Sequence, residues 1–354
     1  MKERIVLAHA GGTGTAAAIS WLAREYGADV VTLTVDLGQG RQLDGVHERA
    51  LALGASRAHV IDAREEFVRD FMLPALCADA WQPGRPALVR PLGRALVARR
   101  LVDIAKIEGA TAVAHGDRDA GAEPPFATMI RALDRSLDVI PVMQVASARG
   151  RAVPSDDGPG VDANLWGRAM TLDAARASGE PSDEIYALTK AVDETPEQAA
   201  YVDIAFACGV PTAINGVEMA LVELIQSLQT IAGAHGVGRG DAIDQRADGQ
   251  NARVISEAPA ATALAAAHAE LQRLVTSRDV ERLASDASGK YFDLAATGRW
   301  FTPARKALNA LVNEVQQHVT GTVRLKLHKG DCRVVSRESA APVATEPAAE
   351  TARQ

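Results

Sequence analysis

The sequence has little cysteine, no sustained basic run and no long apolar run, and each absence excludes a class of protein. Its three cysteines, Cys77, Cys208 and Cys332, are far apart and lack the spacing of a disulfide framework or a zinc site. No apolar run approaches the ~18 residues of a membrane-spanning helix, and the N-terminal residues lack a signal-peptide pattern. We therefore expect a cytoplasmic protein with no membrane partner and no metal site.

The charge of the chain argues against nucleic-acid binding. The formal net charge is -7, the pI is near 5.7, and the arginines are scattered rather than clustered. With 47% hydrophobic and 23% charged residues among 354, the composition is that of a globular protein with core enough for more than one domain. We expect small-molecule substrates and no nucleic-acid partner.

The first part of the chain alternates between strand and helix patterns. Apolar runs predict strands at residues 4–10, 28–38, 56–63 and 111–116. Helical periodicity lies between them, with an interruption near Pro74. Strands joined by helices predict right-handed crossovers and a largely parallel sheet. We therefore predict an α/β domain of the nucleotide-binding type over residues 1–150, with ligands at the carboxyl ends of its strands.

The chain changes character after residue 150. Frequent turn residues and runs such as "AYVDIAFACGV" predict an α+β domain with an antiparallel meander over residues 151–300. Residues 301–338 predict a helix and a hairpin, and residues 339–354 have the composition of a disordered tail. The apolar stripe of this helix needs a cover, which is either the same chain or another subunit. The second case makes it an oligomerisation helix of a homotetramer or homodimer. The stripe consists of Leu308, Leu311, Val312, Val315 and Val319.

Several segments, taken in order, resemble one family. They include "WLAREYGADVVTLTVDLGQG", "RRLVDIAKIEGATAVAHG", "DANLWGR", "HGVGR" and "HVTGTVRLKLHKG". From about Ile5 to Glu338 the chain resembles argininosuccinate synthase. The resemblance implies an ATP-pyrophosphatase domain, a synthetase domain and a C-terminal helix that is exchanged within a tetramer. It also implies a reaction in which ATP adenylylates the ureido oxygen of citrulline and the amine of aspartate displaces AMP.

The stretch "LAHAGGTGTAAA" stands where the family has its phosphate loop, "SGGxDTS". Both serine positions hold alanine, Ala10 and Ala16, and Gly14 replaces the aspartate. A hydrogen bond to a charged group contributes ~1.5–3 kcal/mol, so losing three such groups predicts weak nucleotide binding or none. A glycine turn at a helix N-terminus still forms an anion site. The residues left for nucleotide binding are Gly11, Gly12, Thr13 and Thr15.

The segments that hold citrulline and aspartate in the family also differ here. The chain has "RPALVRP" where the family has "RYPLGTA", which places Pro86 at the tyrosine and Arg90 at the threonine. It has "AHGDRDAGAEPPFA" where the family has "AHGCTGKGNDQVRFE". In a later segment Asp244 stands at a glutamate position and Ser256 at a tyrosine position. We therefore predict that argininosuccinate synthesis has been lost.

Charged residues have been gained at the carboxyl end of the strand predicted at residues 111–116, where the chain has Asp117, Arg118, Asp119 and Glu123. Carboxylates beside apolar walls can acquire a pKa suited to acid–base chemistry, and arginines can clamp a carboxylate or phosphate. A histidine at a strand end can move a proton or serve as a hydrogen-bonded core residue, and a charged loop can simply be solvated. The predicted catalytic residues are Glu123, Asp117 and His9, and the predicted substrate-binding residues are Arg90, Arg118, Asp119 and Asp244.

Three functions fit this pattern. The gain of charge favours an enzyme of secondary metabolism that needs no cofactor and condenses an amino acid or amine with a keto acid or aldehyde, by imine formation or Pictet-Spengler-type cyclisation. The second is a pseudoenzyme scaffold that keeps the assembly without catalysis. The third is an ATP-dependent ligase with a changed acceptor, which binds Mg-ATP through the glycines of the loop.

Overall fold

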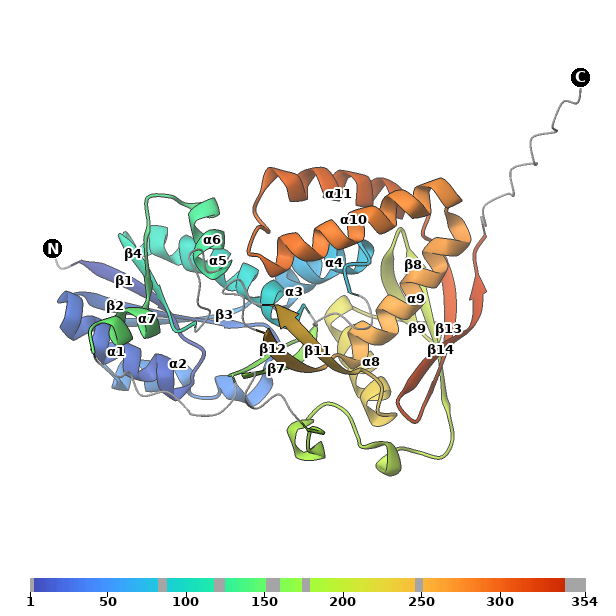
Figure 1. Ribbon diagram of the computed structural model, residues 1–354, viewed down its shortest axis with the longest axis horizontal. Helices are drawn as coiled ribbons and strands as arrows, with labels where there is room; N and C mark the ends of the chain where they lie inside the picture. Colours follow the sequence, from blue (N-terminus) through green and yellow to red (C-terminus); the bar gives the residue numbers. More distant parts are fainter. Residues whose placement is uncertain are drawn as a thin grey trace, which may run out of the picture.

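The first domain is built on a parallel sheet. The computed structural model describes residues 3–81, 88–117, 125–150, 160–173, 179–245 and 251–340. In this part of the chain, five parallel strands have the order β3-β2-β1-β4-β5 (Figure 1). The predicted α/β fold with a parallel sheet is thereby confirmed. The strands are β1 (Arg4–Ala8), β2 (Asp29–Asp36), β3 (Arg57–Asp62), β4 (Ala112–His115) and β5 (Asp138–Pro141).

Both faces of this sheet are buried, which explains the continuous apolar runs of its central strands. Successive side chains point to opposite faces of a strand. Ile5 and Leu7 of β1 therefore join one hydrophobic cluster, and Val6 joins the other. The helices of this domain are α1 (Thr13–Tyr26), α2 (Val46–Ala52), α5 (Val89–Glu108), α6 (Pro125–Leu133) and α7 (Val142–Ala148), with the 3₁₀ turn η1 (Gly40–Leu43).

A continuous helix of three parts connects the two halves of the molecule. It consists of α3 (Arg64–Phe67), the π-helical turn η2 (Val68–Met72) and α4 (Leu73–Cys77). Proline lacks an N–H and its ring crowds the preceding turn, so the wider π-turn before Pro74 accommodates it. The interruption predicted at Pro74 is thus a local widening, and the helix continues through it. Beyond this point, α4 packs against helices of the second domain.

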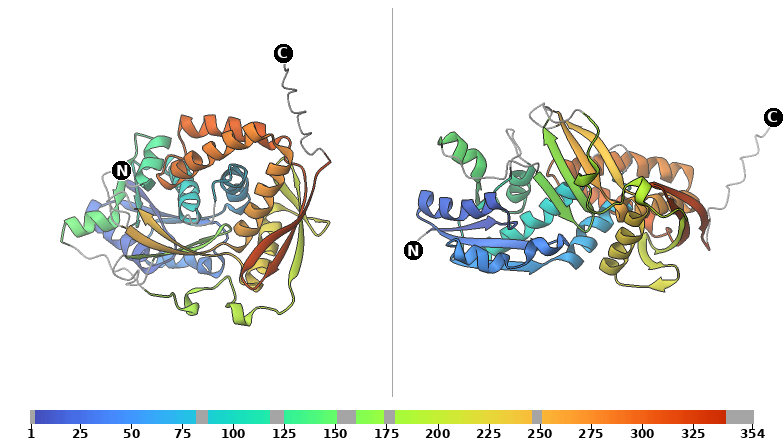
Figure 2. Two further views of the ribbon diagram at one scale, coloured as in Figure 1. Left: turned by 45° about the vertical axis from the view of Figure 1, so that its right-hand side comes forward. Right: turned by 90° about the horizontal axis from the view of Figure 1, so that it is seen from below.

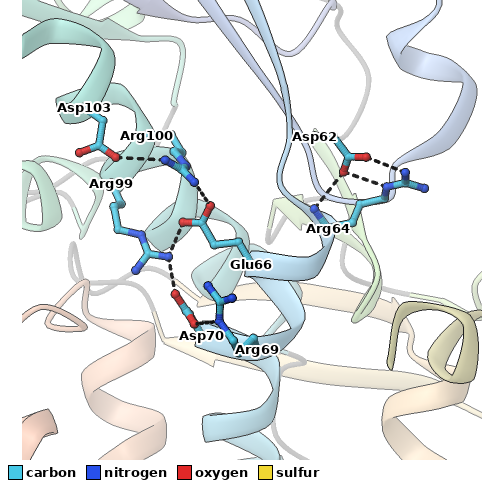
Figure 3. A network of polar contacts seen from close by, with 8 residues as sticks. All are labelled: Asp62, Arg64, Glu66, Arg69, Asp70, Arg99, Arg100 and Asp103. Carbon is cyan, nitrogen blue, oxygen red and sulfur yellow. Dashed lines mark hydrogen bonds and ion pairs between the residues drawn. The ribbon is translucent and has the colours of Figure 1, made fainter. Parts of the chain in front are cut away.

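Ion pairs fix this helix against α5 (Figure 3). Glu66 accepts hydrogen bonds from both Arg99 and Arg100. Asp70 accepts from Arg99 at 2.8 Å, and the guanidinium of Arg99 also lies 4.9 Å from the centre of the Phe71 ring. The side chain of Glu66 is only 11% exposed, so these contacts are shielded from solvent. They hold α5, which borders the site described below, in a fixed position.

The second domain contains two antiparallel sheets. A four-stranded sheet has the order β11-β12-β7-β6, and a five-stranded sheet has the order β10-β9-β8-β13-β14. The four-stranded sheet lies between the two five-stranded ones (Figure 2). The predicted α+β character of this region is confirmed. Its strands are β6 (Gly160–Asn164), β7 (Gly167–Asp173), β8 (Ala200–Ala207), β9 (Val210–Ile214), β10 (Val217–Glu218), β11 (Arg239–Gln245), β12 (Asn251–Glu257), β13 (Gly321–His328) and β14 (Asp331–Glu338).

The apolar stripe of the C-terminal helix is covered by its own chain. Helix α11 packs against α10 and α4, and its Val312 and Val315 are buried. Strand β13 continues the sheet by pairing with β8. Burial of these two valines therefore needs no second subunit, whereas Leu308 and Leu311 are only partly buried. The proposed homo-oligomer stays a prediction. The helices and 3₁₀ turns of this domain are α8 (Leu221–Ala234), α9 (Pro259–Val275), α10 (Arg278–Ala296), α11 (Pro303–Gln316), η4 (Asp183–Ile185) and η5 (Val192–Glu194).

The predicted absence of a membrane-spanning helix and of a metal site can be compared with the described residues only. No helix among them is both long and apolar enough to cross a membrane. No group of three or more His, Cys, Asp or Glu side chains in the same ranges is arranged to hold a metal ion. Of the predicted tail, residues 341–354 lie outside the described part of the chain.

Candidate active site

A cavity of about 740 Å³ lies at the carboxyl edge of the parallel sheet. The ends of β1, β2 and β4 form its floor, the first half of α5 forms one wall, and β6 of the second domain forms another. This is the position at which open α/β sheets bind ligands. The cavity is lined by the side chains or backbone of His9, Gly11, Gly12, Thr15, Thr34, Gln39, Arg90, Arg94, His115, Asp117, Asp162 and Asn164, among others.

The loop after β1 presents an open helix N-terminus to this cavity. Gly11 has a φ of 83°, a left-handed conformation that glycine adopts without strain. Gly12 caps α1 in an extended conformation, no side chain caps the helix there, and its first turn has no acidic residue. A Cβ placed on Gly12 would meet nothing within 4 Å. Backbone N–H groups and the helix dipole therefore face free space that suits an anion.

His9 and Thr15 lie on either side of this loop and contact each other. His9 is 3% exposed, and its Nδ1 lies 2.9 Å from Oγ1 of Thr15. The Thr15 hydroxyl also lies 3.2 Å from the carbonyl oxygen of Gly12. Burial lowers the pKa of His9, and the positive charge of Arg49 lowers it further. The imidazole is therefore neutral near pH 7, and it serves as a hydrogen-bonding group.

Two ion pairs contribute the charged part of the lining. Arg94 donates to the carboxylate of Asp117, and both side chains are largely buried. The backbone N–H of Asp117 donates to Nδ1 of His115 at 3.2 Å, which fixes the turn after β4. Nε of Arg90 donates to Asp162 at 2.6 Å and so joins α5 to β6. The pair of Arg90 and Asp162 therefore joins the first domain to the second, whereas the pair of Arg94 and Asp117 lies within the first domain.

The cavity collects six of the predicted site residues. They are His9, Gly11, Gly12, Thr15, Arg90 and Asp117. Thr13 begins α1, but the structure does not describe its side chain, and Arg118, Asp119 and Glu123 lie outside the described residues. Asp244 is exposed on β11 and is not part of this lining. Its proposed role in substrate binding, like the roles of the undescribed residues, stays a prediction.

Two charged residues of the cavity, Arg94 and Asp162, were not predicted from the sequence. Arg94 lies one helical turn after Arg90, so the i, i+4 spacing could have identified it as a neighbour on the same face. Asp162 follows a turn-rich segment in which no local pattern indicates contact with α5. Only the docking of β6 on α5 brings Asp162 to the cavity.

Comparison with known proteins identifies the family. The model of the argininosuccinate synthase N-terminal HUP domain matches residues 4–156, and that of the C-terminal domain matches residues 160–350. The chain belongs to the argininosuccinate synthase family. It is 41% identical to the argininosuccinate synthase of Brevibacillus brevis over 96% of this chain and 84% of that protein. It is 39% identical to that of Streptococcus thermophilus, over 96% of this chain and 88% of the relative.

These relatives correct the main functional prediction. The chain was expected to have exchanged ATP-dependent ligation for ATP-independent condensation of an amine with a carbonyl compound. Similarity of about 40% over nearly the whole chain to proteins named argininosuccinate synthase supports ATP-dependent ligase activity instead, so that prediction was wrong. The prediction gave the three lost side chains more weight than the glycine turn. The backbone N–H groups at the start of α1 do not depend on the side chains at positions 10, 14 and 16.

Proposed function

We propose that this chain is an ATP-dependent carbon–nitrogen ligase that makes argininosuccinate from citrulline and aspartate. In the reaction that the family resemblance implies, the ureido oxygen attacks the α-phosphorus of ATP and pyrophosphate leaves. The amine of aspartate then attacks the ureido carbon, AMP leaves, and the nitrogen loses a proton. The observation that supports this proposal most directly is the turn at Gly11 and Gly12 before α1. No side chain caps the N-terminus of this helix, so its backbone N–H groups can bind an anion in the cavity.

Each part of the cavity has a role in this reaction. The glycine turn accepts the phosphates, and the Thr15 hydroxyl lies beside it as a further donor. Leu33 and Val35 of β2 offer an apolar surface next to this turn, as expected for a site that buries part of a nucleotide. Arg90 and Asp162 form the wall between α5 and β6, where the acceptor and the amine would bind, and the pair of Arg94 and Asp117 also lines the cavity.

A second candidate keeps the ATP chemistry and changes the acceptor. The ion pair between Arg90 and Asp162 favours it, because the family resemblance places a neutral threonine at position 90. A guanidinium and a carboxylate give this wall a polarity that differs from one built of hydroxyl groups. An acceptor with a complementary charged group would then replace citrulline.

One assay tests both candidates. The purified chain is mixed with Mg-ATP, aspartate and citrulline, and the release of pyrophosphate and AMP is followed with mass spectrometry of the products. Equal amounts of AMP, pyrophosphate and argininosuccinate are the expected result. Product formation only with a different ureido or guanidino acceptor supports the second candidate. A chain that binds no Mg-ATP in titration calorimetry contradicts both.

Assembly is a separate proposal. We propose a homotetramer or homodimer, in keeping with the family resemblance, and no nucleic-acid partner. Light scattering of the purified protein measures the mass of the particle directly. A 37.3 kDa particle at micromolar concentration contradicts the proposed assembly.

A further inference from the structure

His9 is held rigidly at the end of β1. Its backbone N–H donates to the carbonyl of Leu33 at 2.8 Å, and its own carbonyl accepts from the hydroxyl of Thr34 at 2.7 Å. Both partners belong to β2, so the histidine is fixed to the neighbouring strand on both sides of its Cα atom. The ring is nearly inaccessible to solvent yet borders the cavity.

Thr15 is held from two directions. Its hydroxyl oxygen lies 2.9 Å from Nδ1 of His9. Its methyl group lies against Gly116 after β4, where a Cβ would come within 3.0 Å of Cγ2. The methyl and hydroxyl groups therefore cannot exchange places without a collision or the loss of the contact with His9. The position of the Thr15 oxygen is thus defined by two residues, His9 and Gly116, which directly follow β1 and β4.

The Thr15 hydroxyl has only one hydrogen, and the group to which it donates that hydrogen depends on whether His9 donates or accepts. With the hydrogen of the neutral imidazole on Nδ1, His9 donates to Thr15, and the hydroxyl hydrogen is left to donate elsewhere. The nearby carbonyl of Gly12, at 3.2 Å, accepts it when nothing else is bound. An anion over Gly11 and Gly12 is a stronger acceptor than a carbonyl, because charged hydrogen bonds are shorter and stronger.

We propose that His9 is a positioning residue for nucleotide binding, which orients the Thr15 hydroxyl toward a phosphate oxygen over Gly11 and Gly12. The inference rests on the proposed function, since it requires a phosphate ligand. The contact between the Thr15 hydroxyl and a phosphate would matter because the loop has few other side-chain donors. Between positions 10 and 16, Thr13 and Thr15 are the two hydroxyl residues, and Ala10, Gly14 and Ala16 offer no side-chain donor.

A double-mutant cycle tests this role. The Kd of Mg-ATP is measured by calorimetry for the wild-type chain, His9→Phe, Thr15→Val and the double variant. Loss of one hydrogen bond to a charged group predicts a rise in Kd of about tenfold for Thr15→Val. His9→Phe is expected to raise it severalfold. The double variant should be no worse than Thr15→Val alone, because His9 acts through Thr15.

Two conservative variants separate positioning from a general effect on folding. Thr15→Ser keeps the hydroxyl, and His9→Asn places an amide nitrogen near the place of Nδ1. His9→Asn is expected to bind Mg-ATP nearly as well as the wild type. Thr15→Ser lacks the methyl group against Gly116 but keeps the contact with His9, so its Kd should rise clearly less than that of Thr15→Val. In turnover, His9→Phe should raise the KM for ATP more than it lowers kcat, and its melting temperature should show that the chain is folded.

The outcomes are distinct. A wild-type chain that binds Mg-ATP, together with His9→Phe of unchanged affinity, overturns the role of His9 and leaves the proposed function intact. Independent, additive effects of His9→Phe and Thr15→Val also overturn it, since they place His9 outside the path through Thr15. Failure of the wild-type chain to bind Mg-ATP removes the proposed function and this role together.

Discussion

His9 and His268 are both buried histidines, but they lie in regions of opposite character. His268 on α9 is 1% exposed, and its Nε2 lies 2.7 Å from Oε1 of Gln316 on α11. The Gln316 amide donates to the carbonyl of Cys77 on α4 and to Oε1 of Gln272, at 3.0 and 2.8 Å. The amide oxygen carries no hydrogen, so Oε1 of Gln316 accepts from Nε2 of His268 while its NH2 group donates to the other two partners. Every contact in this network is with another protein group.

The loop after β1 also has a hydrogen-bonded histidine, but its network is open to the cavity on one side. His9 contacts Thr15, and Thr15 in turn faces the cavity. A closed network contributes to stability, because each buried donor and acceptor is satisfied within the fold. A network with one side open to a cavity can also bind a ligand. The following predictions test whether the two regions have these separate roles.

The largest effect is expected from Gln316→Leu. This change leaves His268, Gln272 and the carbonyl of Cys77 without the buried partner shown here. An unsatisfied buried polar group costs ~1–3 kcal/mol, so we expect a loss of about 4 kcal/mol in the free energy of unfolding. Urea denaturation measures it. The neighbouring Gln317→Leu, on an exposed side chain, is the matched control and should change stability by no more than about 0.5 kcal/mol.

A similar loss for both variants contradicts the structural role of the closed network. The Kd of Mg-ATP should be the same for Gln316→Leu as for the wild type under conditions in which the variant is folded. A large change in Kd would mean that the two regions are coupled.

The second prediction concerns acid. Burial lowers the pKa of His268 from 6.5 to about 4. Below pH 6.5 the unfolded chain therefore takes up a proton that the folded chain excludes, and stability falls as the pH falls from 6.5 toward 4. The expected slope is about 1.4 kcal/mol per pH unit, or about 3 kcal/mol over the window. Above pH 6.5 both states are neutral and this contribution is constant.

Urea denaturation of the wild type and His268→Gln at several pH values between 7 and 4.5 isolates this effect. The variant has no titrating group at position 268, so its stability should depend less steeply on pH. Parallel pH curves for the two chains would show that His268 does not titrate in this way.

The third prediction concerns the loop after β1, which faces the cavity. Gly12→Ala adds a methyl group where nothing lies within 4 Å, and the φ of -76° at this position suits alanine. Glycine is preferred to alanine at a helix N-cap, so we expect a loss of about 1 kcal/mol in the free energy of unfolding. Because the methyl occupies the proposed phosphate space, we expect the Kd of Mg-ATP to rise about tenfold. An unchanged Kd would place the phosphates elsewhere.

The smallest effect on stability is expected from Arg90→Thr. The ion pair with Asp162 is partly exposed, and such pairs contribute about 0.5 kcal/mol. The change should alter the KM for the acceptor severalfold and leave the KM for ATP as it is, since Arg90 belongs to the wall between α5 and β6, whereas the loop after β1 is proposed to hold the phosphates. Steady-state kinetics with each substrate varied in turn measures both. An equal rise in both KM values would contradict the division of the cavity into nucleotide and acceptor sides.

Much of the first domain could be predicted from local pattern. The buried strands β1 and β2 are continuous apolar runs, and helices with glycine ends separate them. Strand β5 was not predicted, because it has only four residues and includes Pro141. The helix through Pro74 was expected to be interrupted there, and the interruption takes the form of the π-turn η2 just before the proline. Tertiary packing against α5 favours a continuous helix at this point.

The site was only partly predictable for a different reason. Glycines at 11 and 12 after a buried strand indicate an anion site, and that part of the prediction matches the cavity lining. Which charged residues join the site depends on contacts between distant segments. Asp162 lies 72 residues from Arg90, and no periodicity connects the two.

The sequence by itself determined the alternation of strands and helices, the glycine turn and the family, because these depend on neighbours along the chain. The tertiary structure decided that Thr15 is held by His9 and Gly116, that Arg90 meets Asp162, and that α11 is covered by α4 and α10. Such contacts depend on how sheets and helices pack, since a side chain's partners are set by the three-dimensional arrangement of its element. The residues of the site are local in their chemistry, and their combination is a property of the fold.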